Sequence, residues 1–192
     1  MSKTRKLRLP LSTVYSEEDY NSNDGMLTTV WGPSMWHVLH TISFNYPVHP
    51  TACQKRKYRE FVLNLKHVLP CGKCRKNLYK NMATLPLTLK HMKSRATFSR
   101  YVYDLHEVVN TMLHKNSGLT FEDVKERYEH FRARCAISKK KTQKRKKEEG
   151  CVEPLVGEKS KCVLKIVPQD TKCDTFQMDD RCVKHRNTTE QN

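Results

Sequence analysis

Between residues 31 and 135, apolar side chains recur every three or four positions, the spacing that places them on one face of an α-helix. No stretch of this region alternates convincingly as a strand. The spacing predicts five helices, over about residues 33–45, 54–69, 71–85 and 97–115 and from residue 121 onward. About 100 residues is an ordinary size for one hydrophobic core. We therefore expect an all-α fold, a five-helix bundle with a four-helix core and a short fifth helix.

Local signals support the individual helices. Pro33 suits the first position of a helix, where its missing N–H costs nothing. Thr120 and Asp123 resemble a capping box for the fifth helix. The predicted inward stripes on the second, fourth and fifth helices are, respectively, Tyr58, Phe61, Val62, Leu65, Val68 and Leu69; Phe98, Tyr101, Val102, Leu105, Val108, Val109, Met112 and Leu113; and Phe121, Val124, Tyr128 and Phe131.

Composition divides the rest of the chain. Residues 1–30 show no sustained periodicity and are expected to form a mostly disordered arm, residues 136–150 a basic linker, and residues 151–192 a cysteine-containing tail of unknown fold. The chain carries a formal net charge of +16. Its most basic run, 139–147, is a candidate polyanion contact. Arg8 and Pro10 interrupt the only signal-like start, and no apolar run is long enough for a membrane span, so we expect neither secretion nor a membrane anchor.

Cys71 and Cys74 are the first candidates for chemistry. They lie three residues apart at a predicted helix start, where amide donors and the helix dipole favour a thiolate. A zinc site would need about four ligands, and the helical region offers no second pair with this spacing. A thioredoxin-like site would need strands around it. A redox-active disulfide is the favoured interpretation, with metal ligands or inert thiols as alternatives.

Two polar and aromatic pairs are spaced by four residues. His106 and Asn110 share one helix face, and so do Trp36 and His40. Together they suit a flat heterocycle with hydrogen-bonding edges. Each pair alone is also typical of an ordinary helix surface or core.

In this order and spacing, the motifs resemble the FAD-linked sulfhydryl oxidases of the Erv/ALR family. The matching elements are W-G-P-x-x-W-x-x-x-H at 31–40, Y-P at 46–47, P-C-x-x-C at 70–74, and H-x-x-V-N at 106–110 followed by Leu113 and Lys115. The resemblance covers about residues 31–135. The short forms of large DNA viruses look most similar, since they share the L-P-C-x-x-C and P-L-T-L elements.

The resemblance implies a helical bundle that holds FAD, acts as a homodimer and oxidises protein dithiols with O2, giving H2O2. Cys71 would exchange with substrate, and Cys74 would pass electrons to the flavin. The positions that match FAD contacts are Gly32, Trp36, His40, Tyr46, His106, Val109, Asn110, Leu113 and Lys115. No metal is implied. By family likeness the location would be the host cytoplasm or the virion.

Two features depart from the family pattern. Many members carry Asn where Glu107 stands, and many have a C-x16-C pair that this region lacks. Cys53 and Cys135 could pair with each other or across a dimer, although we expect both to stay reduced. The tail cysteines are consistent with a zinc or disulfide module, a shuttle pair or incidental thiols. They are Cys151, Cys162, Cys173 and Cys182.

A non-enzymatic module that binds nucleic acid or metal is the alternative to the oxidase. Charge alone would support it. However, aromatic residues are not interleaved with the basic run at 139–147, as a base-stacking platform would require. The sequence therefore favours the flavin-dependent oxidase.

Overall fold

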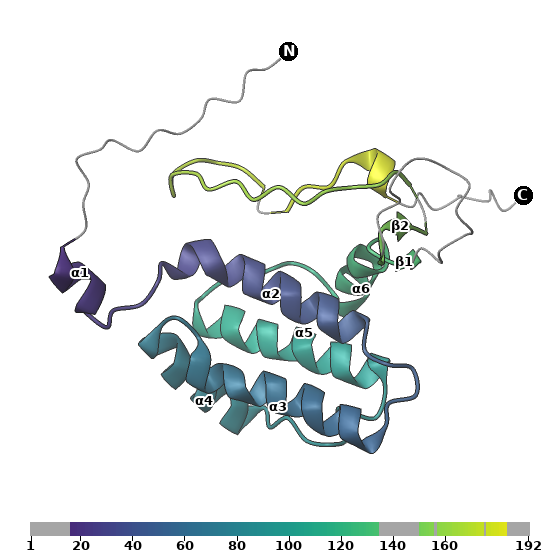
Figure 1. The fold of residues 1–192 in the computed structure, drawn as a ribbon, viewed down its shortest axis with the longest axis horizontal. Coiled ribbons are helices and arrows are strands. Elements are labelled where there is room, and N and C mark those ends of the chain that lie inside the picture. The colour runs from purple at the N-terminus through teal and green to yellow at the C-terminus, as the bar shows by residue number, and fades with distance from the viewer. Residues whose placement is uncertain (1–15, 135–149, 156, 175, 184–192) are drawn as a thin grey trace, which may run out of the picture.

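The computed structural model describes residues 16–134, 150–155, 157–174 and 176–183 (Figure 1). The elements of this part of the chain are α1 (Glu17–Asn21), α2 (Thr28–Phe44), α3 (Ala52–Val68), α4 (Gly72–Thr84), α5 (Arg95–Met112), α6 (Phe121–Glu129), β1 (Ala133–Arg134), β2 (Glu153–Pro154) and the 3-10 helix η1 (Asp180–Cys182). The five predicted helices correspond to α2 through α6, which confirms the helical fold class.

The bundle is built around α5. Helix α2 packs on one side of α5 and α4 on another, α3 packs against α4, and the short α6 contacts both α2 and α5 (Figure 1). The core cluster comprises Leu39, Tyr46, Val62, Leu65, Leu69, Leu78, Met82, Leu87, Met92, Phe98, Tyr101, Val102 and Leu105. Fully burying an apolar side chain of this size contributes about 1.5–3 kcal/mol, so this cluster is the main source of stability.

Side-chain caps fix where several helices begin. The hydroxyls of Thr51, Ser94 and Thr120 each accept the backbone N–H three residues later, and the residue at that position bonds back to the cap. The capping box expected at Thr120 and Asp123 is confirmed. Each box satisfies backbone donors that would otherwise lack a partner at a helix start.

The N-terminal arm differs from the expectation of disorder. Ser16 caps α1 through a capping box with Asp19, and α2 begins at Thr28 instead of near Pro33. Pro33 therefore lies in the second turn of α2, where it cannot donate the N–H that would bond to the Thr29 carbonyl. Helix α2 continues past Pro33 because its packing against α5 and α6 stabilises it. Residues 1–15 lie outside the described part.

Five residues of the predicted inward stripes are exposed, among them Met112 and Leu113 at the end of α5. The exposed fractions are 41% for Phe61, 68% for Val68 and 38% for Phe131. An outer helix buries only the arc that faces its neighbours, so side chains at the edge of an apolar stripe remain in contact with solvent.

The tail contributes the only strand pairing in the described part of the chain. β1 and β2 form an antiparallel pair, in which Ala133 lies opposite Pro154 and Arg134 opposite Glu153. A two-residue strand is too short to show an alternating pattern, so periodicity could not predict it. Cys135 and the basic run 139–147 lie outside the described residues. None of the helices in the described ranges is long and apolar enough to cross a membrane.

Candidate active site

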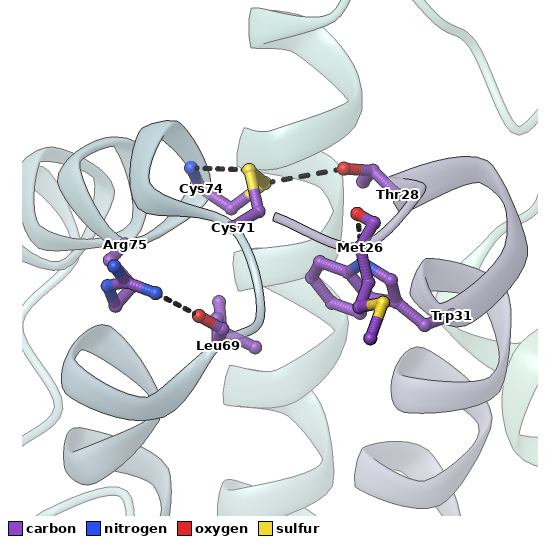
Figure 2. The surroundings of a disulfide bond; sticks show 7 residues. All are labelled: Met26, Thr28, Trp31, Leu69, Cys71, Cys74 and Arg75. Carbon is purple, nitrogen blue, oxygen red and sulfur yellow. Dashed lines mark hydrogen bonds between the residues drawn. A yellow bond between two sulfur atoms is a disulfide. The ribbon is translucent and has the colours of Figure 1, made fainter. Parts of the chain in front are cut away.

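The redox-capable cysteines lie at the start of α4, as predicted. Cys71 and Cys74 form a disulfide with their Cα atoms 5.1 Å apart (Figure 2). Cys71 is the N-cap residue of α4, and its Sγ accepts the backbone N–H of Cys74 at 3.2 Å. Both residues are half-buried. A helix N-terminus stabilises negative charge, so the pair sits where a thiolate is favoured once the disulfide is reduced.

The guanidinium of Arg75 does not point at the sulfurs (Figure 2). The guanidinium of Arg75 donates to the carbonyl of Leu69, away from the disulfide (Figure 2). Lys73 is exposed to solvent. The helix start is therefore the main feature that stabilises a thiolate at this pair. The side chains of Lys73 and Arg75 contribute less than the sequence suggested.

Residues 25–28, which we call the strap, lie on the cysteine pair. The backbone N–H of Met26 donates to the carbonyl of Pro70 at 2.8 Å. The Met26 carbonyl accepts the indole N–H of Trp31 at 3.0 Å (Figure 2). A Cβ added at Gly25 would lie 2.6 Å from Pro70 O and 2.9 Å from Cys71 Cα. Sequence reasoning missed the strap, and the glycine at position 25 is the one signal that was available.

A second cluster joins α2 to α5. The rings of Trp36 and His106 stack with their centroids 4.0 Å apart and an interplanar angle of 8°. His40 Nε2 lies 3.1 Å from His106 Nδ1. The structure thus brings together the polar and aromatic pairs that the sequence singled out on separate helices.

Both histidines of this cluster are neutral near pH 7. Burial lowers the pKa of His40 to about 3, and the positive charge that His106 and His37 can carry adds to the effect. Burial also lowers the pKa of His106 to about 4, although nearby Glu107 opposes the shift. Two neutral imidazoles share one hydrogen between His40 Nε2 and His106 Nδ1, so the tautomer of one ring fixes that of the other.

His40 carries a polar atom that fits a bound heterocycle. The ring is 4% exposed, and its Nδ1 has no hydrogen-bond partner among the described residues. Buried polar atoms are normally paired, so an unpaired one is expected to meet a ligand or an ordered water. Gly32 fits a ligand as well, because a Cβ added there would meet only Thr28 Cγ2, at 3.7 Å. The packing of the chain itself does not require a glycine at this position.

These residues form a single line along α2. Thr28, Gly32, Trp36 and His40 are each four residues apart, so they follow one ridge of the helix. At its first residue, Thr28 Oγ1 lies 3.6 Å from Cys74 Sγ (Figure 2). At its last, His40 Nε2 lies 3.1 Å from His106 Nδ1. Twelve residues of α-helix span about 18 Å. The ridge therefore connects the disulfide to the histidine pair.

The end of α5 supplies the other predicted positions. Val109 and Asn110 are half-buried, whereas Leu113 and Lys115 are exposed just beyond the helix. Their exposure leaves these two residues accessible to a ligand.

The hydrogen bonds of Glu107 fix the direction of its carboxylate. Its Oε1 accepts the amide N–H of Asn110 at 2.9 Å and the hydroxyl hydrogen of Ser117 at 3.0 Å. The carboxylate therefore joins Asn110, one of the predicted cofactor positions, to Ser117 in the loop that follows α5.

Tyr46 is not part of this arrangement. It is fully buried, its hydroxyl donates to the Met92 carbonyl at 2.9 Å, and its ring packs edge-on against Tyr58 and Phe98. No surface of Tyr46 is left for a ligand. The expected cofactor contact at this position is therefore not supported, and the residue anchors the loop before α5.

Two residues that sequence reasoning did not assign to the site pack behind His40. The rings of Tyr128 and Phe44 stack on each other with centroids 5.4 Å apart, and Tyr128 also stacks on His40 at 5.1 Å. The Tyr128 hydroxyl lies 3.3 Å from His37 Nδ1. The inward stripe of the fifth helix included Tyr128 but gave no indication that it would support His40.

A model of the Erv1 / Alr family matches residues 33–129. This match runs from the second turn of α2 to the end of α6. The chain belongs to this family. The strap and the described part of the tail lie outside the matched residues.

Several Erv1/Alr relatives are similar over this region. A probable FAD-linked sulfhydryl oxidase, R368, of Acanthamoeba polyphaga mimivirus is 38% identical over 80 residues, which are 42% of this chain and 56% of the relative. The mitochondrial FAD-linked sulfhydryl oxidase ERV1 of Saccharomyces cerevisiae is 31% identical over 84 residues, 44% of this chain and 43% of the relative. The chain spans about half the length of these two relatives.

An FAD-linked sulfhydryl oxidase of African swine fever virus, isolate Warthog/Namibia/Wart80/1980, is 28% identical over 99 residues, which are 52% of this chain and 80% of the relative. Among solved structures, the yeast Erv1 core is 26% identical, with a TM-score of 0.49 over 62% of this chain and 94% of that chain.

Proposed function

We propose that this Erv1/Alr protein is an FAD-dependent thiol oxidase that forms disulfides in protein dithiol substrates. The observation that carries the proposal is the ridge on α2, which leads from the Cys71–Cys74 disulfide to the histidine pair of α2 and α5. A redox pair at one end and a planar, neutral binding surface at the other suit a cofactor with flat rings. The names of the mimiviral, yeast and swine fever virus relatives agree with this assignment.

The two cysteines have different proposed roles. A substrate thiolate attacks Cys71 Sγ, a mixed disulfide forms, the Cys71–Cys74 bond breaks, and Cys74 leaves as a thiolate. The second substrate thiol loses its proton and attacks the substrate sulfur of the mixed disulfide, whose bond to Cys71 Sγ breaks so that Cys71 leaves as a thiolate. The substrate then leaves oxidised, and the two electrons remain on the reduced cysteine pair.

The residues that would hold FAD are those of the ridge and of α5. Trp36 and His106 offer flat ring faces, His40 Nδ1 offers an unpaired polar atom, and Gly32 allows close approach to the helix. We assign supporting contacts to the end of α5, namely Val109, Asn110, Leu113 and Lys115. The bound flavin supplies two-electron redox chemistry between the cysteine pair and O2, with H2O2 as product.

We also propose, from the family likeness, that the chain works as a homodimer. The similarity to proteins of two viruses supports a viral protein that acts in the host cytoplasm or in the virion. Sedimentation equilibrium of the purified chain tests the first proposal, and a monomer at micromolar concentration would contradict it.

An absorbance spectrum of the purified full chain tests the function. We expect flavin bands that bleach when dithiothreitol is added without oxygen and return in air. A protein that is colourless and takes up no added FAD would contradict the proposal and favour the non-enzymatic binding module. A yellow protein whose bands do not bleach would keep the cofactor but contradict the thiol chemistry.

A further inference from the structure

We propose that Thr28 is a catalytic residue, whose hydroxyl donates a hydrogen bond to Cys74 Sγ when Cys74 leaves as a thiolate. This inference rests on the proposed function and names a residue that serves it. Thr28 Oγ1 lies 3.6 Å from Cys74 Sγ, within the longer range that hydrogen bonds to sulfur adopt (Figure 2). Thr28 lies outside the part of the chain that the family model matches.

The change in the sulfur during the reaction gives the contact its effect. In the disulfide, Cys74 Sγ is a weak acceptor, whereas the thiolate released from it carries a full negative charge. A hydroxyl that is already in place therefore stabilises the products of bond cleavage more than the starting disulfide. This differential stabilisation is what lowers a barrier.

The contact also helps to decide which sulfur is attacked. A thiol of lower pKa leaves faster in thiol–disulfide exchange. Attack on Cys71 expels Cys74, so a donor on Cys74 favours attack on Cys71. Thr28 is in addition the first residue of the 17-residue helix α2, so its contact with Cys74 Sγ lies at the positive dipole end of that helix.

The strap holds Thr28 in this position. Leu27, the N-cap residue of α2, accepts the backbone N–H of Val30 at 2.9 Å, and Met26 is tied to both Pro70 and Trp31. Gly25 allows the chain to lie directly against Pro70 and Cys71. The backbone is therefore held on both sides of Thr28, and χ1 of this β-branched side chain is the one torsion that places the hydroxyl.

The pKa of the Cys74 thiol tests the proposal without any cofactor chemistry. In a Cys71→Ser background, the rate at which iodoacetamide alkylates the Cys74 peptide is followed by mass spectrometry across pH. Hydrogen bonds to charged groups are strong enough for Thr28→Val to raise this pKa by about one unit. Thr28→Ser, which keeps the hydroxyl, should restore the original value, and Thr29→Val, an exposed neighbour, should leave it unchanged.

A second variant reaches the same contact through the backbone. Gly25→Ala should displace the strap and raise the Cys74 pKa in the same direction as Thr28→Val, while Thr28 itself is retained. An unchanged pKa in Thr28→Val would overturn the proposal, and so would an equal rise in Thr28→Ser.

The outcome is separable from that of the proposed function. A yellow protein that dithiothreitol bleaches, but whose Cys74 pKa does not respond to Thr28→Val, keeps the oxidase and rejects the role of Thr28. A colourless protein whose Cys74 pKa does respond rejects the oxidase and keeps the contact between hydroxyl and thiolate.

Discussion

The helical bundle and the tail both contain cysteines, but they give them very different surroundings. All of the buried apolar side chains of the described residues lie between Leu39 and Val124, whereas none of the described residues from 150 to 183 is buried. In the bundle, Cys71 and Cys74 are half-buried at a helix start and joined by a disulfide. In the tail, Cys162 and Cys173 are exposed, and neither forms a disulfide with another described residue.

The tail is held by a few specific contacts and lacks a core of its own. The N–H of Leu155 donates to the Arg132 carbonyl at 3.0 Å, and Phe176 packs against His37 and Phe131 and lies 4.7 Å from the guanidinium carbon of Arg127. The difference shows that the number of cysteines in a region does not predict where a redox-active pair lies. A position at a helix start makes a thiol reactive, because it favours the thiolate.

The largest expected effect separates the two sets of cysteines. We expect Cys71→Ser and Cys74→Ser each to abolish oxidation of dithiothreitol, whereas Cys162→Ser in the tail leaves the rate unchanged. Cys74→Ser should still form mixed disulfides at Cys71 without reducing the flavin. A peroxide assay measures all three, and wild-type turnover in either bundle variant would disprove the assignment.

The neutral histidines of the bundle make its stability depend on pH. The unfolded chain binds protons near pH 6.5, but burial keeps His40 and His106 neutral in the folded state down to a pKa of about 3 and about 4, respectively. The free energy of unfolding is therefore highest above pH 6.5 and falls as the pH drops toward 4. At pH 5 the loss is about 2 kcal/mol for each buried histidine.

Urea unfolding at pH 7, 6 and 5 checks this dependence at constant flavin content. A hydrogen bond from Arg132 lowers the pKa of Glu129. Glu129 therefore changes the free energy of unfolding only below the pH range of this measurement. His106→Gln should remove part of the slope, and the rest comes from His40 and from His37, whose pKa burial also lowers. His67→Gln, a change at an exposed position, should not alter the slope. Equal stability at pH 7 and pH 5 in the unmutated protein would refute the prediction.

The aromatic stack of the bundle is expected to hold the cofactor. Trp36→Ala removes the ring that stacks on His106, and His106→Ala removes both that stack and the contact with His40. Each should cost about 1–3 kcal/mol of FAD affinity. Trp36→Phe keeps a flat ring and should lose less. Flavin content after dialysis is the measurement, and equal content in Trp36→Ala and the unmutated protein would contradict the role.

Removing the tail tests whether the bundle stands alone. A chain that ends at Cys135 should remain yellow and oxidise dithiothreitol, because the core cluster and the ridge lie entirely within the remaining residues. If tail cysteines relay electrons, this chain should slow on protein thiols only. A colourless or aggregated product would show that the tail belongs to the fold, and our boundary at residue 135 would then be wrong.

The smallest expected effect concerns how the tail is attached. Phe176→Ala should cost about 0.5–1.5 kcal/mol of the free energy of unfolding, through the loss of its aromatic contacts. Leu164→Ala, a change at an exposed tail residue, should cost nothing measurable. Thermal unfolding of the two variants gives the comparison. Equal melting temperatures would show that the packing of Phe176 does not stabilise the bundle.

Local sequence signals determined much of this molecule. Helical periodicity predicted α2 to α6, proline and capping residues marked several of their ends, and the spacing of Cys71 and Cys74 placed a redox pair at the start of a helix. These features depend on residues within one or two turns of each other, so the local sequence is sufficient to predict them.

Only the tertiary structure brought residues distant in the sequence together. It placed Gly25 and Thr28 on the cysteine pair, stacked Trp36 on His106, and put Tyr46 in the core instead of at the site. Periodicity reports which face of a helix is apolar, but not which helix that face meets or at what register. Those choices follow from how the side chains of α2, α4 and α5 pack together, because tight packing permits few arrangements of neighbouring helices.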